Sequence, residues 1–371
     1  MPIPLLDLKA QYKTIRDDVL RVTEEVYESQ YFILGPRVDA FERDFAAYCH
    51  STYAVGVSSG TDALLEALMV LGIGHGDEVI VPAFSFFATA GVVHRLGARP
   101  VFVDVRLDDY NIDPALIEEK ITDRTRAIMP VHLYGQCADM TAVNELAQRR
   151  GIAVIEDAAQ AVGAEFEGKR AGALGTLGCF SFFPSKNLGG FGDAGAITTN
   201  DKAMYEKLVD FRVHGMRPKY FHHYVGGNFR IDALQAAILH VKLPHLEAWT
   251  EGRRSNATKY AKLFADAKAG ERVVLPTELE GRRHVFNQYI VRFPEGRTTR
   301  DRVLEHLKSK SIGCEIYYPL TLPQQKCFAD VAEGSYPNSD AAAEQTLAIP
   351  IYPELTDAQL QEIVTEIAAA L

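Results

Sequence analysis

The sequence predicts an α/β protein with a large domain built on a mostly parallel sheet and a smaller C-terminal α+β domain. Its 371 residues, 47% of them hydrophobic and 24% charged, are enough for a full core and two domains. Between residues 50 and 200, short β-rich runs alternate with helical patterns, which is typical of a parallel sheet covered by helices on both faces. From about residue 245 a long helical pattern is followed by a mixture of strands and helices.

The strands of the large domain are expected where β-branched and apolar residues cluster, at Tyr53–Val57, Val79–Val81, Pro100–Val105, Ala127–Val131, Ile152–Glu156 and Gly178–Phe183. Thr61–Leu71 carries leucines at helical spacing, and Asp113-Pro114 supplies a capping aspartate followed by proline at the first helical position. Both patterns predict helix starts. A further helix is expected over Ile231–Leu243.

The C-terminal part is expected to contain the strand Val285–Phe293, the helix Arg300–Lys310, the strand Gly313–Tyr317 and a closing helix from Thr356. We place the boundary so that residues 1–245 form the large domain and residues 246–371 the small one. The connecting region is not rich in glycine or serine, so we expect the two domains to be tied rigidly.

Composition excludes several functions. With 39 Lys+Arg against 49 Asp+Glu, the formal charge of -10 leaves no positive excess for a nucleic-acid backbone, so we expect no nucleic-acid partner. The first ten residues include Asp7 and Lys9, and no apolar run is long enough to cross a bilayer, so we expect a cytoplasmic protein without a membrane partner. The 5 cysteines are odd in number and show no C-x-x-C spacing, which argues against disulfides and against a metal site.

Lys186 is the candidate catalytic residue. It lies in the segment Ser181–Gly190, among aromatic and small residues and directly after a β-rich run. In a partly dry pocket an ammonium group is disfavoured, and the neutral amine becomes a nucleophile for an aldehyde, as a Schiff base requires. The alternative is a solvated lysine in a glycine loop, so the neighbouring segments must decide.

Two upstream segments supply partners for such a lysine. The buried strand Ile152–Glu156 leads into Asp157 at the carboxyl edge of the sheet, where the carboxylate could pair with a pyridine nitrogen or cap the next turn. The strand Tyr53–Val57 runs through Ser58–Thr61 into a helix, which suits a phosphate cradle, although every βα unit needs a capped turn. Together the three features match the phosphate, the ring nitrogen and the aldehyde of pyridoxal phosphate.

Nearly the whole chain resembles the DegT/DnrJ/EryC1/StrS family of nucleotide-sugar aminotransferases, which have the aspartate-aminotransferase-like fold (fold type I). The matching segments are Tyr31–Pro36, Ser59–Leu64, Gly76–Pro82, Glu156–Gln160, Ser181–Lys186 and Asn228–Asp232. The resemblance implies that Lys186 binds pyridoxal 5'-phosphate as a Schiff base, that Asp157 pairs with the pyridinium and that Gln160 bonds the ring hydroxyl. It also implies a set of further cofactor contacts: Ser59, Gly60, Thr61 and Ser181 on the phosphate, Phe86 stacked on the ring, and Asn228 reaching the partner's site in a homodimer with shared active sites.

The resemblance implies a reaction as well. An amino acid, with L-glutamate expected, would give its amino group to a keto group of a UDP- or dTDP-linked sugar, at carbon 3 rather than carbon 4, for deoxyamino-sugar or surface-glycan biosynthesis. Substrate contacts are expected from Arg230, His222 and Tyr317. Arg230 could instead form an interface ion pair, and His222 next to His223 lacks the acidic or cysteine companion of a metal site. Tyr317 and Pro323 stand where many relatives have histidine. These departures bear on which sugar and which nucleotide the protein binds, and not on the cofactor.

Two other functions share this fold. A sugar dehydratase of the family has histidine in place of the lysine, so Lys186 favours the aminotransferase. A regulatory protein that binds pyridoxal phosphate without turnover would use the same cofactor residues. Formation of 2-oxoglutarate from glutamate separates the enzyme from the regulatory protein.

Overall fold

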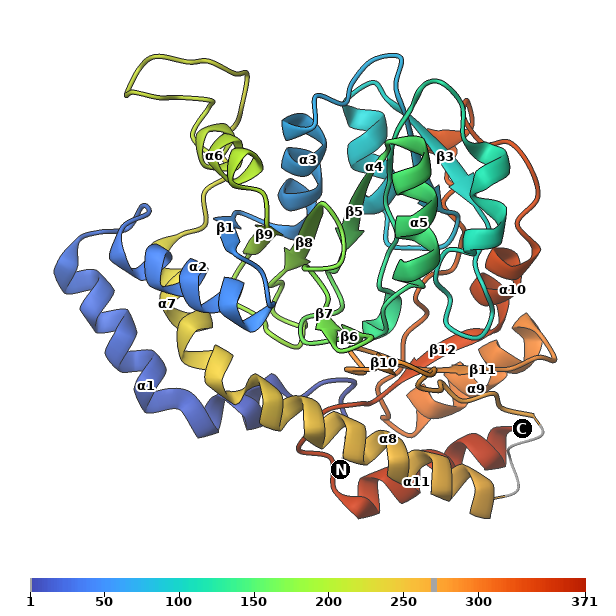
Figure 1. Ribbon diagram of the computed structural model, residues 1–371. Coiled ribbons are helices and arrows are strands. Elements are labelled where there is room, and N and C mark those ends of the chain that lie inside the picture. The colour runs from blue at the N-terminus through green and yellow to red at the C-terminus, as the bar shows by residue number, and fades with distance from the viewer. Residues whose placement is uncertain (1, 268–271) are drawn as a thin grey trace.

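The computed structural model describes residues 2–267 and 272–371, with a larger α/β part above a smaller C-terminal part in Figure 1. A seven-stranded sheet of order β1-β9-β8-β5-β4-β2-β3 runs through the larger part. β9 is antiparallel to β1 and β8, and the other neighbouring pairs are parallel, which confirms the predicted mostly parallel sheet. The strands are β1 (Tyr53–Val57), β2 (Glu78–Pro82), β3 (Arg99–Val103), β4 (Thr125–Ile128), β5 (Ala153–Asp157), β8 (Leu177–Ser181) and β9 (Gly195–Thr199).

Helices cover both faces of this sheet. One face packs against α2 (Pro36–Tyr48), α5 (Met140–Arg150) and α7 (Ala233–Lys242), with α1 (Leu8–Ser29) lying against α7. The opposite face packs against α3 (Gly60–Val70), α4 (Ala88–Arg95) and α6 (Lys202–Phe211). Because both faces are covered, strand residues of either parity are buried, such as Ala54 in one core and Val55 in the other.

Two predicted helix starts have different outcomes. The pattern over Thr61–Leu71 is confirmed as α3, whose N-cap Ser59 accepts a hydrogen bond from the amide of Asp62 at 3.0 Å. Asp113 also caps, with its carboxylate accepting from the amide of Ala115, but it opens two successive 3-10 turns (Pro114–Leu116 and Glu118–Lys120) rather than an α-helix.

The C-terminal part has its own core of apolar side chains. Its elements are α8 (Leu246–Asp266), β11 (Tyr289–Arg292), α9 (Arg297–Ser309), α10 (Pro337–Gln345), β12 (Thr346–Ile349) and α11 (Asp357–Ala370), with β11 and β12 antiparallel. The closing helix is confirmed, and Thr356 forms a capping box with Gln359. Ile3 packs in this core although it belongs to the N-terminal segment, and we keep the division at residue 245 as a proposal.

The predicted strand over Gly313–Tyr317 does not form. Gly313 donates its amide to the carbonyl of Ile3 at 2.7 Å, whereas Glu315 makes a single bridge to Ala348 of β12. The segment therefore changes partners after two residues, and a continuous ladder needs one partner strand. The predicted strand Val285–Phe293 is shortened to β11, because the amide of Val285 bonds the carbonyl of Gly135 instead of a strand.

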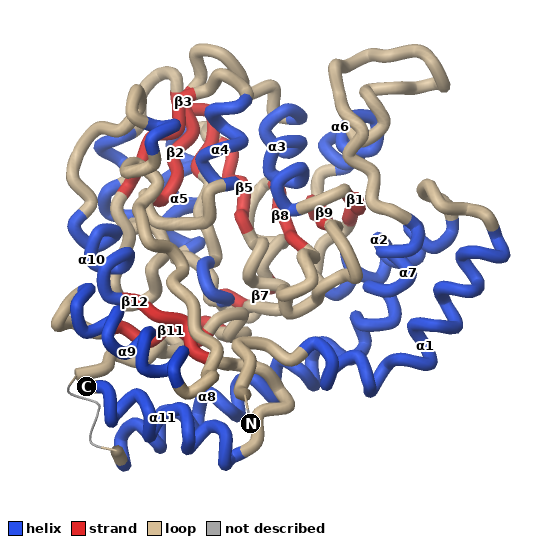
Figure 2. Tube along the Cα trace, turned by 180° about the vertical axis from the view of Figure 1, so that it is seen from behind, coloured by secondary structure: helices blue, strands red, loops and turns tan. Residues whose placement is uncertain are grey.

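Short strands join the two parts. β6 (Glu165–Phe166), β7 (Lys169–Arg170) and β10 (Arg282–Arg283) form a three-stranded sheet that lies between them in Figure 1. Figures 1 and 2 both show the connection from α6 to α7 projecting away from the rest of the chain. Among the described helices, none combines the length and the apolar character that a membrane span requires.

Candidate active site

A cavity of about 350 Å³ lies where β5 and β8 end, beside the first turn of α3. Its volume is in the range of small-molecule sites. Residues that directly follow parallel strands line it, as expected for a binding site at the carboxyl edge of an open α/β sheet. Of the predicted site residues, the cavity is lined by Ser59, Gly60, Thr61, Phe86, Asp157, Gln160, Ser181, Lys186 and Tyr317.

Lys186 lines this cavity. Burial lowers the pKa of the amine to about 8, although the carboxylate of Asp157 acts in the opposite direction. At pH 7 about one amine in ten is then neutral, against about one in 3,000 for a lysine with a pKa of 10.5. Lys186 is therefore far better suited to attack an aldehyde than a solvated lysine.

Asp157 faces the same cavity and is 4% exposed. Its Oδ2 accepts a hydrogen bond from Thr89 Oγ1 at 2.8 Å, and its Oδ1 accepts from the amide of Ala159 at 3.2 Å. Burial raises the pKa of the carboxyl, while Thr89, the Ala159 amide and the charge of Lys186 counteract the rise. A carboxylate in this setting has a strong preference for a cationic partner.

Thr89 belongs to a short hydroxyl chain that sequence reasoning missed. An ionised carboxylate only accepts, so Thr89 donates its proton to Asp157, and Ser85 in turn donates to Thr89 across 2.8 Å. Ser85 and Thr89 follow β2, at the same sheet edge as Asp157. Their position after a strand of the parallel sheet marks them as residues of this sheet edge, but no local pattern in the sequence pairs Thr89 with Asp157.

The first turn of α3 can hold an anion. The amides of Gly60 and Thr61 have no acceptor within the helix, and the helix dipole places partial positive charge there. A Cβ added to Gly60 would lie 2.6 Å from the Cβ of Ser181, so only glycine lets the turn approach β8 this closely. The hydroxyl of Ser181 lies beside these amides, and the hydroxyl of Ser59, which donates to Asp62 Oδ2 at 3.0 Å in this structure, would turn from Asp62 to a bound phosphate. With these donors the turn fits a phosphate group.

Gln160 connects the cavity to the C-terminal part. Its Oε1 accepts from the amide of Tyr134 at 2.7 Å, and its Nε2 donates to the hydroxyl of Tyr318 at 3.1 Å, which leaves one Nε2 hydrogen for a ligand. Tyr318 was not predicted as a site residue, yet it lines the cavity, and its ring centroid lies 6.0 Å from that of Phe86. The ring of Phe86 is 54% exposed and is therefore free to stack on a ligand.

Three predicted site residues do not line this cavity in their own chain. Asn228, Arg230 and His222 lie in the connection from α6 to α7, where Asn228 is exposed and Arg230 pairs through its backbone with Val57. The ring of His222 donates from Nδ1 to the carbonyl of His214 at 3.0 Å, a contact within the connection itself. Their predicted roles stay predictions.

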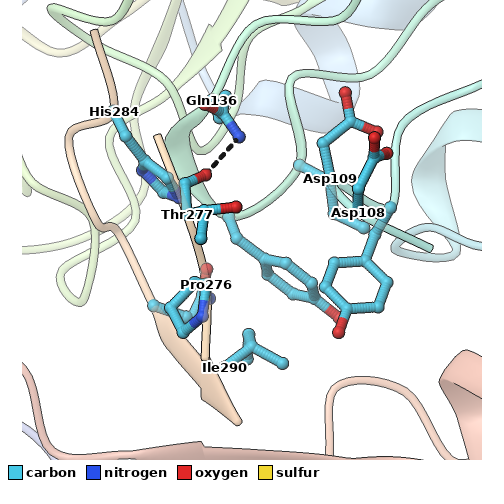
Figure 3. Close-up of a pocket in the computed structure, with 11 residues that line it drawn as sticks. Asp108, Asp109, Gln136, Pro276, Thr277, His284 and Ile290 are labelled. Atoms are coloured by element: carbon cyan, nitrogen blue, oxygen red, sulfur yellow. Dashed lines mark hydrogen bonds between the residues drawn. The ribbon is translucent and has the colours of Figure 1, made fainter. Parts of the chain in front are cut away.

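A separate cavity of about 10 Å³ is lined by residues that include Gln136, Thr277 and His284 (Figure 3). Gln136 crosses it with a hydrogen bond from Nε2 to the carbonyl of Thr277 at 3.2 Å, and burial lowers the pKa of the nearby His284 to about 3, so that this ring is neutral. The space suits no more than about one water molecule. The cavity beside Lys186 is the candidate active site because it brings together Lys186, Asp157 and the first turn of α3.

The comparisons with known proteins find relatives of similar length and fold over nearly the whole chain. The model of the DegT/DnrJ/EryC1/StrS aminotransferase family matches residues 13–368. A relative from Geobacillus stearothermophilus, named pleiotropic regulatory protein, is 49% identical over 370 residues, 99% of this chain and 98% of that protein. The UDP-N-acetyl-3-dehydro-alpha-D-glucosamine 3-aminotransferase of Acidithiobacillus ferrooxidans is 44% identical over 369 residues, 100% of this chain and 98% of that protein. A crystal structure of S. venezuelae DesV in complex with a ketimine intermediate superposes with a TM-score of 0.94 at 41% identity, covering 99% of this chain and 98% of that one.

Proposed function

This chain belongs to the DegT/DnrJ/EryC1/StrS aminotransferase family, and from that premise we propose that it transfers an amino group from L-glutamate to a keto group of a UDP- or dTDP-linked sugar. The predicted fold, the dependence on pyridoxal phosphate and the aminotransferase activity are confirmed. The observation that supports the cofactor chemistry of this proposal is that Lys186, Asp157 and the first turn of α3 meet in one cavity. The choice of donor and sugar is supported by the family and by the names of relatives that act on UDP- and dTDP-linked sugars.

When bound, pyridoxal phosphate supplies an aldehyde and a pyridine ring that accepts electrons. We propose that Lys186 Nζ holds the aldehyde carbon and, once released, moves a proton from the α-carbon of the amino acid. The Asp157 carboxylate would hold a proton at the ring nitrogen. Gln160 would donate to the ring hydroxyl, and the ring of Phe86 would cover one face of the cofactor.

The phosphate of the cofactor would rest on the first turn of α3. We propose the amides of Gly60 and Thr61 and the hydroxyls of Ser59 and Ser181 as its donors. These groups carry no formal charge, so the helix dipole provides the electrostatic part of the binding.

We further propose that transfer takes place at carbon 3 of the sugar, for deoxyamino-sugar biosynthesis. The name of the 44% identical Acidithiobacillus ferrooxidans relative, a UDP-sugar 3-aminotransferase, supports this choice. Substrate contacts from Tyr317, Arg230 and His222 remain part of the proposal. Tyr317 lines the cavity of its own chain, whereas the other two require a partner chain.

A homodimer with shared active sites would place Asn228 in the partner's cavity. Large apolar side chains are exposed beside the cavity and on the loop before α2, which supports an interface there. Phe86 and Phe183 are 54% and 53% exposed, and Tyr31 and Ile33 are 65% and 54% exposed.

The test is the complete reaction in two halves. Holoenzyme mixed with L-glutamate should release about one 2-oxoglutarate per bound cofactor and then aminate a nucleotide-linked 3-keto sugar. A matched 4-keto sugar with the same nucleotide serves as the control for position. No release of 2-oxoglutarate would contradict the donor, and amination of the 4-keto sugar alone would contradict the position.

A further inference from the structure

A second cavity, of about 40 Å³, adjoins the candidate active site on the side of the C-terminal part. The side chains of Ser185, Gln288 and Tyr317 line both cavities. The rest of the small cavity is lined by apolar residues of the N-terminal segment, of β12 and of the residues just after it, by Asn287, and by one charged residue, Arg253 on α8.

Arg253 carries a buried charge without a carboxylate partner. It is 4% exposed, and its Nη1 donates to the carbonyl oxygens of Phe286 at 3.1 Å and Ile351 at 2.7 Å. Within residues 2–267 and 272–371, the guanidinium forms no ion pair, and no acceptor bonds its Nε or Nη2. Burial lowers the pKa of Arg253 to about 10, against the effect of the half-buried Glu354, so the group stays charged at neutral pH. Such a charge is costly unless an anion compensates it.

Two neutral donors face the same space. Asn287 Nδ2 donates to Gln288 Oε1 at 2.6 Å, which fixes the Gln288 amide so that its Nε2 hydrogens remain available. The hydroxyl of Ser185 lines both cavities, one residue before Lys186. A guanidinium, an amide and a hydroxyl thus line the small cavity together. Arg253 is the one charged residue in its lining, so no negative group competes with an anion there.

We propose that Arg253, with Ser185 and Gln288, binds a carboxylate of the amino-acid donor. A planar guanidinium with free Nε and Nη2 suits a carboxylate, whose two oxygens it can bond in parallel. The cavity of about 40 Å³ is much smaller than the neighbouring one of about 350 Å³, which suits a small group such as a carboxylate. Since Ser185, Gln288 and Tyr317 line both cavities, an acid held in the small cavity borders the cavity of Lys186, where the amine of a donor must react.

This inference rests on the proposed function, because only an amino-acid donor brings a carboxylate to Lys186. It adds the requirement that the donor and the sugar are recognised by different residues. The donor should be selected in the small cavity and the sugar elsewhere, so a change at Arg253 should weaken the donor half of the reaction and spare the sugar half.

The experiment compares Arg253→Lys with Arg254→Lys in the holoenzyme. Arg254, the next residue on α8, forms a partly exposed ion pair with Glu278 and controls for a changed charge geometry on this helix. We expect Arg253→Lys to raise the KM for L-glutamate about 10- to 100-fold while the KM for the sugar stays within about twofold, and Arg254→Lys to change neither. The donor 2-aminobutanoate, which lacks the distal carboxylate, identifies which carboxylate is bound: an equal loss with both donors assigns the α-carboxylate, and a loss with glutamate alone assigns the distal one.

Glutarate provides a readout that needs no turnover. Calorimetric titration of the holoenzyme with this unreactive dicarboxylate should show binding in the parent and at least about tenfold weaker binding in Arg253→Lys. If Arg253→Lys does not fold, Gln288→Leu leaves both carbonyl contacts of Arg253 in place and should weaken glutarate in the same direction. A parent that binds glutarate but transaminates no amino acid would overturn the proposed function and keep the site. Unchanged glutarate binding and an unchanged KM for glutamate in a folded Arg253→Lys enzyme would overturn the site.

Discussion

Thr89→Val removes a hydroxyl that stabilises the buried charge of Asp157 while keeping nearly the same side-chain volume. The lost hydrogen bond, 2.8 Å long in the structure, ends on a carboxylate that is 4% exposed, so water has little access to replace it. A hydrogen bond to a charged group is worth about 1.5–3 kcal/mol. At about 1.4 kcal/mol per pKa unit, the pKa of Asp157 should rise by about one to two units.

The assay is the affinity of the apoprotein for pyridoxal phosphate across pH. Asp157 pairs with the ring nitrogen only when ionised, so affinity is lost as pH falls through its pKa, and a higher pKa moves that loss to higher pH. We expect the loss to begin about one to two pH units higher in Thr89→Val. Thr89→Ser keeps the hydroxyl and should follow the parent, and Ser85→Ala, one bond further away, should have a smaller effect. Identical pH profiles for the parent and Thr89→Val would refute this account of Asp157.

Three further predictions address the same site. Covalent capture of pyridoxal phosphate by the apoprotein should speed up as pH rises through about 8, because burial lowers the pKa of Lys186 to that value and only the neutral amine reacts. Stopped-flow absorbance measures the capture rate, and a midpoint of the rate-against-pH curve near pH 10 would contradict this prediction. Asp157→Asn should fold, but its activation free energy should rise by more than the roughly 1.5–3 kcal/mol of one charge-assisted hydrogen bond, since ring protonation matters most in the transition state. Steady-state rates test this, and full activity would reduce Asp157 to a turn cap. Equal mixtures of inactive Lys186→Ala and Asn228→Ala chains should regain roughly a quarter of the parent activity, since half the dimers would contain one native site, and no recovery despite proven exchange of tagged chains would place Asn228 outside the partner's site.

Much of the fold could be predicted because it depends on local patterns. The runs around Tyr53–Val57 and Ile152–Glu156 are apolar enough for buried strands, and α3 begins at a capping serine. Parallel topology then fixes which residues meet, since the carboxyl ends of such strands share one edge. For this reason the meeting of Ser59, Asp157 and Lys186 could be expected from the sequence alone.

The features that sequence analysis missed depend on packing between distant segments. Thr89 reaches Asp157 across 68 positions, and Tyr318 reaches Gln160 across 158, so neither pair produces a local pattern. In the sequence Arg253 is one of two adjacent arginines in a helical pattern, and only its burial in the structure distinguishes it from Arg254. The strand expected over Gly313–Tyr317 does not form for a similar reason. Its residues favour a strand locally, but a strand also needs a partner, and the partners of this segment lie in distant parts of the sequence.

The central claim is that Lys186, and no other lysine, holds the cofactor. The most direct test is reduction of the holoenzyme with borohydride, followed by digestion and mass spectrometry of the pyridoxyl-labelled peptide. Lys242 provides a demanding comparison, since burial also lowers its pKa to about 8 while its amine donates to the carbonyl of Gly189 away from the cavity. The account predicts the label on Lys186 and an unlabelled Lys242, and a label on Lys242 or on any lysine other than Lys186 would contradict it.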